Sequence, residues 1–275
     1  MPHMQGAIWT RLSGGRTNAS WCVQPQHNEP PVVVKLYLGP APNPMFPNDP
    51  VAEAQLLTQL EDLEFAPKLL VHMQTKHGAC NVYSHIPGEI WQSGISEVAE
   101  LMEKIHQQKA PSGLRMVANG SVQVEAHTRA ILSNCDLDST LPFDEFSPEI
   151  HVAPTENTVL LHGDIVPGNI IRNTMGLYLI DWQCPAVGDV CEDISNFLSP
   201  AMQLLYRGAP LQTCEVTEFW FAVGNCMLAE RYKKLAPWYH RRMAAYCLWQ
   251  SQNGKAEYDA ALRLELEYLQ RSLKL

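Results

Sequence analysis

The sequence lacks the features that mark secreted, membrane-spanning and nucleic-acid-binding proteins. Residues 1–10 contain neither the basic nor the apolar segment of a signal peptide. No uninterrupted apolar run is long enough to span a bilayer. Basic residues are few, with 20 Lys and Arg against 29 Asp and Glu, and they form no run that could neutralise nucleic-acid phosphates. These absences argue against nucleic-acid and membrane partners, and the net charge of -9 is compatible with a cationic substrate.

The cysteine pattern is equally uninformative about metals and disulfides. None of the eight cysteines forms a CxxC pair, and the spacing of Cys184 and Cys191 matches no zinc site. We therefore expect mostly buried thiols in a reducing cytoplasm. The chain also has no repeat or low-complexity tract. With 275 residues, 46% of them hydrophobic, it can form one large domain or two coupled lobes.

Residues 160–197 carry the strongest chemical pattern in the chain. His162-Gly163-Asp164 is followed after four further residues by Asn169, and an apolar run at 176–180 leads directly to Asp181. Phosphoryl transfer needs a group that orients the attacking hydroxyl and oxygen ligands that hold magnesium against the phosphates. Asn and Asp oxygens suit this hard cation. Each piece alone is typical of an ordinary loop or turn, so the order and the spacing carry the interpretation.

This segment resembles the aminoglycoside phosphotransferase and choline kinase superfamily, whose motifs read like HGDxxxxN and IDW. Gly188-Asp189 followed by Asp193-Ile194 is similar to a further signature of that family. The resemblance implies a protein kinase-like α+β fold of two lobes, a small β-rich N-lobe with one helix and a larger, mainly helical C-lobe.

The same resemblance implies roles for the individual residues. Asp164 would be the catalytic residue, and Asn169 and Asp181 would bind the metal. His162 and Asp193 would support the site, with Asp193 tying down the catalytic loop instead of touching the substrate.

A lysine and a glutamate upstream complete the pattern. Lys35 lies in the β-prone run 32–37, and Glu53 lies early in a predicted helix over 51–60, with Asp49 as its cap. In kinases a strand lysine contacts the α and β phosphates and is held by a helix glutamate. Glu61 and Glu64 compete for the partner role, and Lys35 could instead lie on a sheet edge with its ammonium in water.

Two backbone segments are predicted to contact the nucleotide. Gly14-Gly15 forms a turn that could cover the phosphates, although it matches neither GxGxxG nor a Walker A loop. Residues 83–89 resemble the interlobe hinge of the family, where the backbone of Ser84, His85 and Ile86 would bond adenine. The alternative is a simple turn at Pro87-Gly88. The predicted boundary at 84–88 gives an N-lobe of residues 1–84 and a C-lobe of residues 85–275.

The remaining pattern is mainly helical, with predicted helices over 96–106, 122–132, 219–235, 237–250 and 256–273. In the family, residues 114–154 and the later helices would shape the acceptor pocket. The acidic residues of that region could bind a cation, and the alternative is a solvated loop; they are Asp136, Asp138, Asp144 and Glu145.

These observations predict an ATP- and Mg²⁺-dependent kinase that phosphorylates a hydroxyl of a small molecule, in the first place a choline-like or ethanolamine-like amino alcohol. The alternatives are an aminoglycoside phosphotransferase and a nucleotide-binding regulatory pseudokinase. A protein kinase fits less well, because Gly163 stands where Arg is usual and Asp181-Trp182-Gln183 replaces DFG. A metallophosphoesterase lacks its cluster of His and Asp ligands.

Overall fold

A computed structural model of the chain describes residues 6–12, 18–26, 29–39, 43–136, 143 and 146–274. The chain forms two compact units. Unit 1 comprises Met1–Trp91, Pro111–Leu114 and Gly168–Pro185, and unit 2 comprises Gln92–Ala110, Arg115–Pro167 and Ala186–Leu275. The chain therefore passes between the units several times, and the linear boundary at 84–88 stays a prediction.

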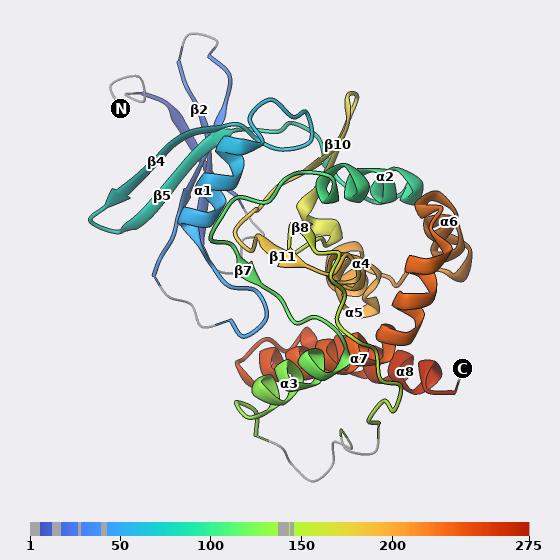
Figure 1. Cartoon of the computed structure of the whole chain (residues 1–275). Coiled ribbons are helices and arrows are strands. Elements are labelled where there is room, and N and C mark those ends of the chain that lie inside the picture. The colour runs from blue at the N-terminus through green and yellow to red at the C-terminus, as the bar shows by residue number, and fades with distance from the viewer. Residues whose placement is uncertain are drawn as a thin grey trace. The chain divides into compact units, whose positions relative to one another are not determined.

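Unit 1 is built on a five-stranded antiparallel sheet with the order β1-β2-β3-β5-β4, drawn in blue and cyan in Figure 1. The β-branched run of β3 lies at its centre and pairs Lys35 with Ser20 on one side and Asn81 on the other. Residues 69–84 form one antiparallel hairpin. The strands are β1 (Ile8–Arg11), β2 (Ala19–Gln24), β3 (Val32–Leu36), β4 (Leu69–Thr75) and β5 (Gly78–Ser84).

Helix α1 (Pro50–Gln59) lies across this sheet against β4 and β5 (Figure 1). Asp49 caps it as predicted, because its Oδ1 accepts the backbone N–H groups of Val51 and Ala52 at 3.0 Å each. Pro50 occupies the first turn, where its missing N–H has no consequence. The buried face of the helix includes Glu53, which is thereby directed at the sheet.

A second, three-stranded antiparallel sheet belongs to unit 1, with the order β10-β9-β6. The strands are β6 (Glu89–Ile90), β9 (Ile170–Asn173) and β10 (Gly176–Leu179), and the 3-10 turn η2 (Pro167–Asn169) precedes β9. Backbone bonds extend the pairing beyond the strands: Trp91 N donates to Ile170 O at 2.9 Å, and Leu179 N donates to Phe65 O at 2.8 Å. The hairpin β9–β10 is therefore attached to the rest of unit 1 on two sides.

Unit 2 is mainly helical around a small sheet in which β11 pairs with both β7 and β8. Helix α7 packs against α3 and α8, and α2 packs against α6. None of the described helices is long and apolar enough to cross a membrane. The elements are β7 (Arg115–Met116), β8 (Val159–Leu161), β11 (Ala186–Gly188), α2 (Ile95–His106), α3 (Ser121–Leu132), α4 (Cys191–Leu198), α5 (Pro200–Arg207), α6 (Thr213–Val223), α7 (Cys226–Gln252) and α8 (Tyr258–Ser272).

The predicted boundary between a helix over 219–235 and a helix over 237–250 is wrong. The break lies at Gly224, whose φ of 62° ends α6, and Asn225 caps α7 by accepting the N–H of Leu228 at 3.0 Å. Pro237 lies inside α7 and does not end it. Packing of α7 against α3 and α8 outweighs the one backbone bond that this proline removes.

Gly188 of β11 lies where a side chain has no room. A Cβ atom there would come within 2.2 Å of Val117 Cγ2 and 3.2 Å of Leu161 Cδ1, and both of these residues are buried. We expect Gly188→Ala to lower the free energy of unfolding by about 1–3 kcal/mol through overpacking, as measured by chemical denaturation. The double variant Gly188→Ala/Val117→Ala should lose less stability than the two single variants together. Equal stabilities of Gly188→Ala and wild type would contradict this account.

Candidate functional site

The hairpin β9–β10 brings together the two predicted metal ligands of unit 1. Asn169 directly precedes β9 and Asp181 follows β10, so antiparallel pairing returns the chain to its starting point. The bond from Ile180 N to Asn169 O, 2.9 Å long, closes the hairpin at this end. Asn169 and the residue before Asp181 are therefore backbone neighbours, as the spacing of the two motifs requires.

Asp181 has an unusual backbone conformation. Its φ is 63°, and among the described residues it is the one non-glycine residue with a positive φ. Such a conformation costs of order 1–3 kcal/mol and persists where the surroundings fix it, which is common at functional sites. The side chain of Asp181 is 30% exposed, so solvent and ligands can reach the carboxylate.

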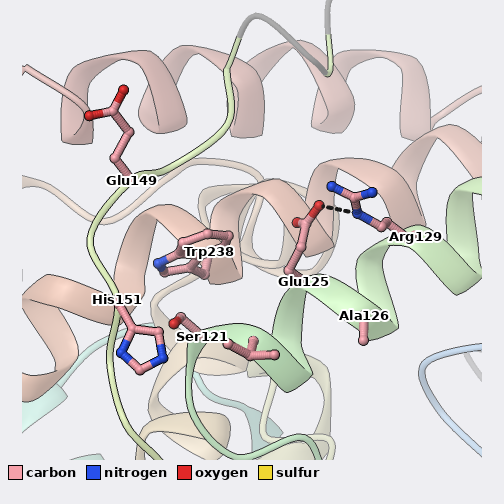
Figure 2. A pocket seen from close by; sticks show the side chains of 8 residues that line it. Ser121, Glu125, Ala126, Arg129, Glu149, His151 and Trp238 are labelled. Atoms are coloured by element: carbon pink, nitrogen blue, oxygen red, sulfur yellow. Dashed lines mark hydrogen bonds and ion pairs between the residues drawn. The ribbon is translucent and has the colours of Figure 1, made fainter.

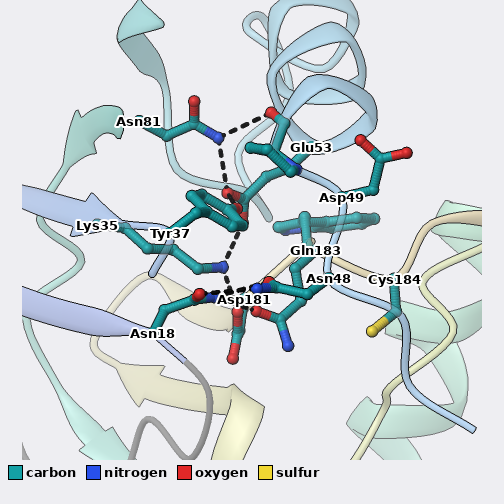
Figure 3. Close-up of polar contacts among 12 residues, drawn as sticks. Asn18, Lys35, Tyr37, Asn48, Asp49, Glu53, Asn81, Asp181, Gln183 and Cys184 are labelled. Carbon is teal, nitrogen blue, oxygen red and sulfur yellow. Dashed lines mark hydrogen bonds and ion pairs between the residues drawn. The ribbon is translucent and has the colours of Figure 1, made fainter. Parts of the chain in front are cut away.

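Lys35 is buried and lies between two carboxylates (Figure 3). Its Nζ is 2.9 Å from Glu53 Oε1 and 2.5 Å from Asp181 Oδ1. Burial by itself lowers the pKa of Lys35, but Asp181 and Glu53 more than offset this effect and raise the pKa well above its usual range. The stabilisation from the pairing is therefore present below the usual lysine pKa of about 10.4 and is lost only as the pH rises through the raised value.

Glu53 is held by donors that sequence reasoning did not identify. Its Oε2 accepts the hydroxyl of Tyr37 and, at 2.8 Å, Nδ2 of Asn81. Burial and the Glu53 carboxylate raise the pKa of Tyr37, although Lys35 opposes them, so the hydroxyl keeps its proton. Asn81 is oriented by a second bond to Pro50 O at 3.1 Å and by His72 Nδ1, 2.6 Å from Asn81 Oδ1. Tyr37 is two residues beyond Lys35, so the alternation of strand faces was the available signal.

The predicted adenine-binding segment is partly occupied within unit 1. The backbone N–H of Ser84 donates to Lys68 O at 2.9 Å, and that of His85 donates to Pro31 O at 3.1 Å. Among the described residues, no partner accepts the N–H of Ile86. Of the three predicted amides, Ile86 is thus the one left for a ligand. The predicted turn at Gly14-Gly15 lies outside the described residues.

In unit 2, Asp193 fixes the backbone of the predicted catalytic loop. This fully buried carboxylate accepts the N–H of His162 at 3.0 Å and the N–H of Gly163 at 2.9 Å. His106 Nε2 lies 3.0 Å from the same carboxylate and must carry a proton there. Asn196 donates to Gly163 O at 3.3 Å. Gly163 has a φ of 80°, a conformation in which glycine is favoured.

Asp164 follows this fixed pair and remains partly exposed. Its N–H donates to Nδ1 of the buried His162 at 3.3 Å, so the histidine side chain orients the backbone that carries the carboxylate. In the neighbouring signature, Asp189 accepts Arg231 Nε at 2.8 Å and Cys191 N at 3.0 Å. His162, Asp189 and Asp193 are buried and support the local structure, whereas Asp164 is partly exposed.

Unit 2 also contains a hollow of about 370 Å³ between α3, residues 149–151 and α7 (Figure 2). Trp238 lines it, with Nε1 donating to Ile150 O at 2.9 Å. Glu125 at its edge is already paired, with Arg129 Nε at 2.8 Å and Arg241 Nε at 3.1 Å. The residues that line it are Ser121, Val122, Glu125, Ala126, Arg129, Glu149, His151 and Trp238.

Comparison with known proteins identifies the family. The model of the phosphotransferase enzyme family, APH, matches residues 8–246. The chain belongs to this phosphotransferase family. The predicted family and enzyme class are thereby confirmed. No curated protein matches the sequence of this phosphotransferase.

Solved structures confirm the predicted kinase-like fold of the phosphotransferase, at identities that speak to the fold alone. A choline/ethanolamine kinase family protein from Mesorhizobium loti has a TM-score of 0.69 at 13% identity, covering 98% of this chain and 89% of the other. An ethanolamine kinase from Plasmodium vivax has a TM-score of 0.70 at 13% identity, covering 99% and 85%. A spectinomycin phosphotransferase, solved with ADP and spectinomycin, has a TM-score of 0.66 at 14% identity, covering 98% and 93%.

Loss of the Lys35 ammonium should destabilise the phosphotransferase. Lys35→Met leaves Glu53, 1% exposed, without its countercharge. We expect a loss of about 3–5 kcal/mol in the free energy of unfolding, because a buried charge without its partner is strongly unfavourable. Chemical denaturation at neutral pH measures it.

The matched control is Lys35→Met/Glu53→Gln, which removes the stranded charge together with the ammonium. It should regain part of the stability lost in Lys35→Met. A double variant less stable than Lys35→Met would contradict the assignment of Glu53 as the buried partner.

Proposed function

We propose that this phosphotransferase moves the γ-phosphoryl group of ATP to a hydroxyl of a small molecule, with Mg²⁺ as its metal. The observation that carries the proposal is the partly exposed Asp181 carboxylate, which lies in a strained conformation, pairs with the buried Lys35 and follows the backbone neighbour of Asn169. A strained conformation at a charged, solvent-accessible residue is more typical of a functional site than of a residue that only stabilises the fold.

The residues around Asp181 fit a magnesium ion. Lys35, Glu53 and Asp181 together carry one surplus negative charge, and the solvent-accessible carboxylate of the three is Asp181. Asp181 and Asn169 would hold the metal through hard oxygen donors, as Mg²⁺ prefers. Within the described part of the chain no three His, Cys, Asp or Glu side chains gather into a metal cage. A site with one or two protein ligands is usual where phosphates supply the others. When bound, Mg²⁺ neutralises charge on the β and γ phosphates.

Each remaining residue then has a defined task. Lys35, oriented by Glu53, contacts the α and β phosphates, and the N–H of Ile86 donates to the adenine. Asp164 orients the acceptor hydroxyl and takes its proton, a role that needs an exposed carboxylate on a fixed backbone. Asp193 and His162 supply that fixed backbone through the bonds to the loop amides.

For the acceptor we propose a cationic amino alcohol of the choline or ethanolamine type, with an aminoglycoside as the second candidate. The acidic balance of the chain and the structural similarity to choline and ethanolamine kinases favour the first. The similarity to a spectinomycin phosphotransferase supports the second. A regulatory pseudokinase has less support, because each residue that phosphoryl transfer requires is present.

An ADP-release assay tests the proposal. ATP and Mg²⁺ are supplied with choline, ethanolamine, thiamine, aminoglycosides, amino sugars or homoserine, and wild type is compared with Asp181→Ala. We expect ADP release that depends on one acceptor class and is lost in Asp181→Ala. Asp62→Ala, which removes an exposed carboxylate of the same unit, should retain wild-type turnover. Equal turnover of wild type and Asp181→Ala would refute the metal assignment.

Asp164→Asn should separate catalysis from folding. The amide keeps the shape of the side chain but cannot take the hydroxyl proton, so we expect kcat to fall by about 10²–10⁴. The thermal midpoint and the affinity for ADP should remain those of wild type. Wild-type kcat in Asp164→Asn would remove Asp164 from the mechanism.

A further inference from the structure

Three buried or half-buried amide side chains of unit 1 form a closed set of hydrogen bonds near Asp181 (Figure 3). Asn18 Nδ2 donates to Gln183 Oε1 at 2.7 Å and to Asn48 Oδ1 at 2.8 Å. Asn48 Nδ2 donates back to Asn18 Oδ1 at 2.8 Å. We call Asn18, Asn48 and Gln183 the amide triad. Its members come from three separate segments of the chain.

Asn18 lies at the centre of the amide triad, because it bonds to both other members. Both protons of its Nδ2 are donated and its Oδ1 accepts, and it is only 8% exposed. Gln183 is 6% exposed. Buried amides of this kind have one satisfactory arrangement, because turning any of them would place donor against donor or acceptor against acceptor. The triad therefore fixes the place of Gln183 relative to Asn18 and Asn48.

Gln183 has a second attachment through its backbone. Its carbonyl accepts the N–H of Asp49 at 3.1 Å, and Asp49 is the residue that caps α1. The neighbouring residues are fixed as well: Trp182 is fully buried with Nε1 donating to Leu179 O at 2.8 Å, and Cys184 Sγ donates to Pro47 O at 3.0 Å. The segment after Asp181 is thus held at three consecutive residues.

Asp181 requires such support. Its positive φ is unfavourable for a residue with a Cβ atom, so the flanking backbone must hold it in place. The backbone bond between Ile180 and Asn169 holds the chain just before Asp181, and the bonds of Gln183 hold it two residues after Asp181. The Lys35 ion pair fixes the carboxylate but does not determine φ.

We infer that the amide triad is a positioning element that holds Asp181 in its metal-binding conformation. Asn18, Asn48 and Gln183 are positioning residues and need no contact with substrate or metal. The inference rests on the proposed function insofar as Asp181 is taken as a metal ligand. Groups that orient a metal ligand typically change metal affinity or activity by about 10–100-fold when they are removed.

The test measures metal affinity directly. Free Mn²⁺, which stands in for Mg²⁺, is followed by electron paramagnetic resonance during titration of the full chain with ADP present. Gln183→Met removes the acceptor for Asn18 while keeping the length of the side chain. We expect Mn²⁺ to bind at least about 10-fold more weakly to this variant, with the affinity for ADP in EDTA unchanged.

Gln203→Met is the matched control. Gln203 is a fully buried glutamine of unit 2 whose Nε2 donates to Phe197 O at 2.7 Å. Its loss should lower the thermal midpoint without changing Mn²⁺ affinity. If Gln183→Met lowers the midpoint to a similar extent and leaves Mn²⁺ affinity at the wild-type value, the amide triad has only a structural role and the inference is overturned. If Gln183→Met does not fold, Asn48→Ala, at the half-buried end of the triad, carries the same test.

Two further variants complete the design. Asn18→Ala should weaken Mn²⁺ binding to a similar degree. The double variant Asn18→Ala/Gln183→Met should bind Mn²⁺ no more weakly than the more affected single variant, because each of these changes breaks the same hydrogen-bond network. Losses of Mn²⁺ affinity that add up in the double variant would overturn the inference.

Asp181→Ala separates the proposed function from the inference about the amide triad. If this variant binds Mn²⁺ as tightly as wild type, the metal assignment of the proposed function fails and the inference fails with it. If Asp181→Ala weakens Mn²⁺ binding and Gln183→Met does not, only the inference fails.

Discussion

The ammonium group of Lys35 is the interaction on which unit 1 depends. It is buried against Glu53 and Asp181, so a strand, a helix and the end of a hairpin are joined through one charge. Both carboxylates would be uncompensated without it, and Glu53 would be so in an interior that water does not reach. Tyr37 and Asn81 also donate hydrogen bonds to the carboxylate of Glu53 and so help to orient it. The partly open Asp181 is consequently the part of the arrangement that can respond to a ligand.

In unit 2, a buried carboxylate fixes the backbone of a loop instead of a charged side chain. Among the described residues, no lysine pairs with Asp193, which instead accepts two consecutive backbone amides, with His106 as a third donor. Such bonds fix a main-chain path, and the next residue, Asp164, stays partly exposed. Glu53 thus positions a charged side chain and Asp193 positions a loop, although nothing in the sequence distinguishes the two kinds of carboxylate. The difference comes from burial and from the donors that surround each group.

The sequence predicted the kinase-like fold, the helix cap at Asp49 and the residues that the structure brings together at Lys35, Glu53, Asn169 and Asp181. These were accessible because strand periodicity and motif spacing are local properties. The amide triad was not accessible, since Asn18, Asn48 and Gln183 are far apart in the chain and amides are common in loops. The length of α7 was also missed, because the proline rule is local whereas the packing that overrides it at Pro237 comes from other helices.

The side chain of Asn81 connects the interior of the sheet to its edge strand. Its Nδ2 donates to Glu53 and Pro50, which fixes the orientation of the amide, and its Oδ1 is an acceptor. His72 on β4, whose Nδ1 faces this oxygen, must therefore carry hydrogen on Nδ1, which fixes the tautomer of a neutral ring. The imidazole of an exposed residue consequently reports, through a single amide, on the carboxylate that orients Lys35. Its ring nitrogens offer a spectroscopic view of a group that is otherwise inaccessible from the surface.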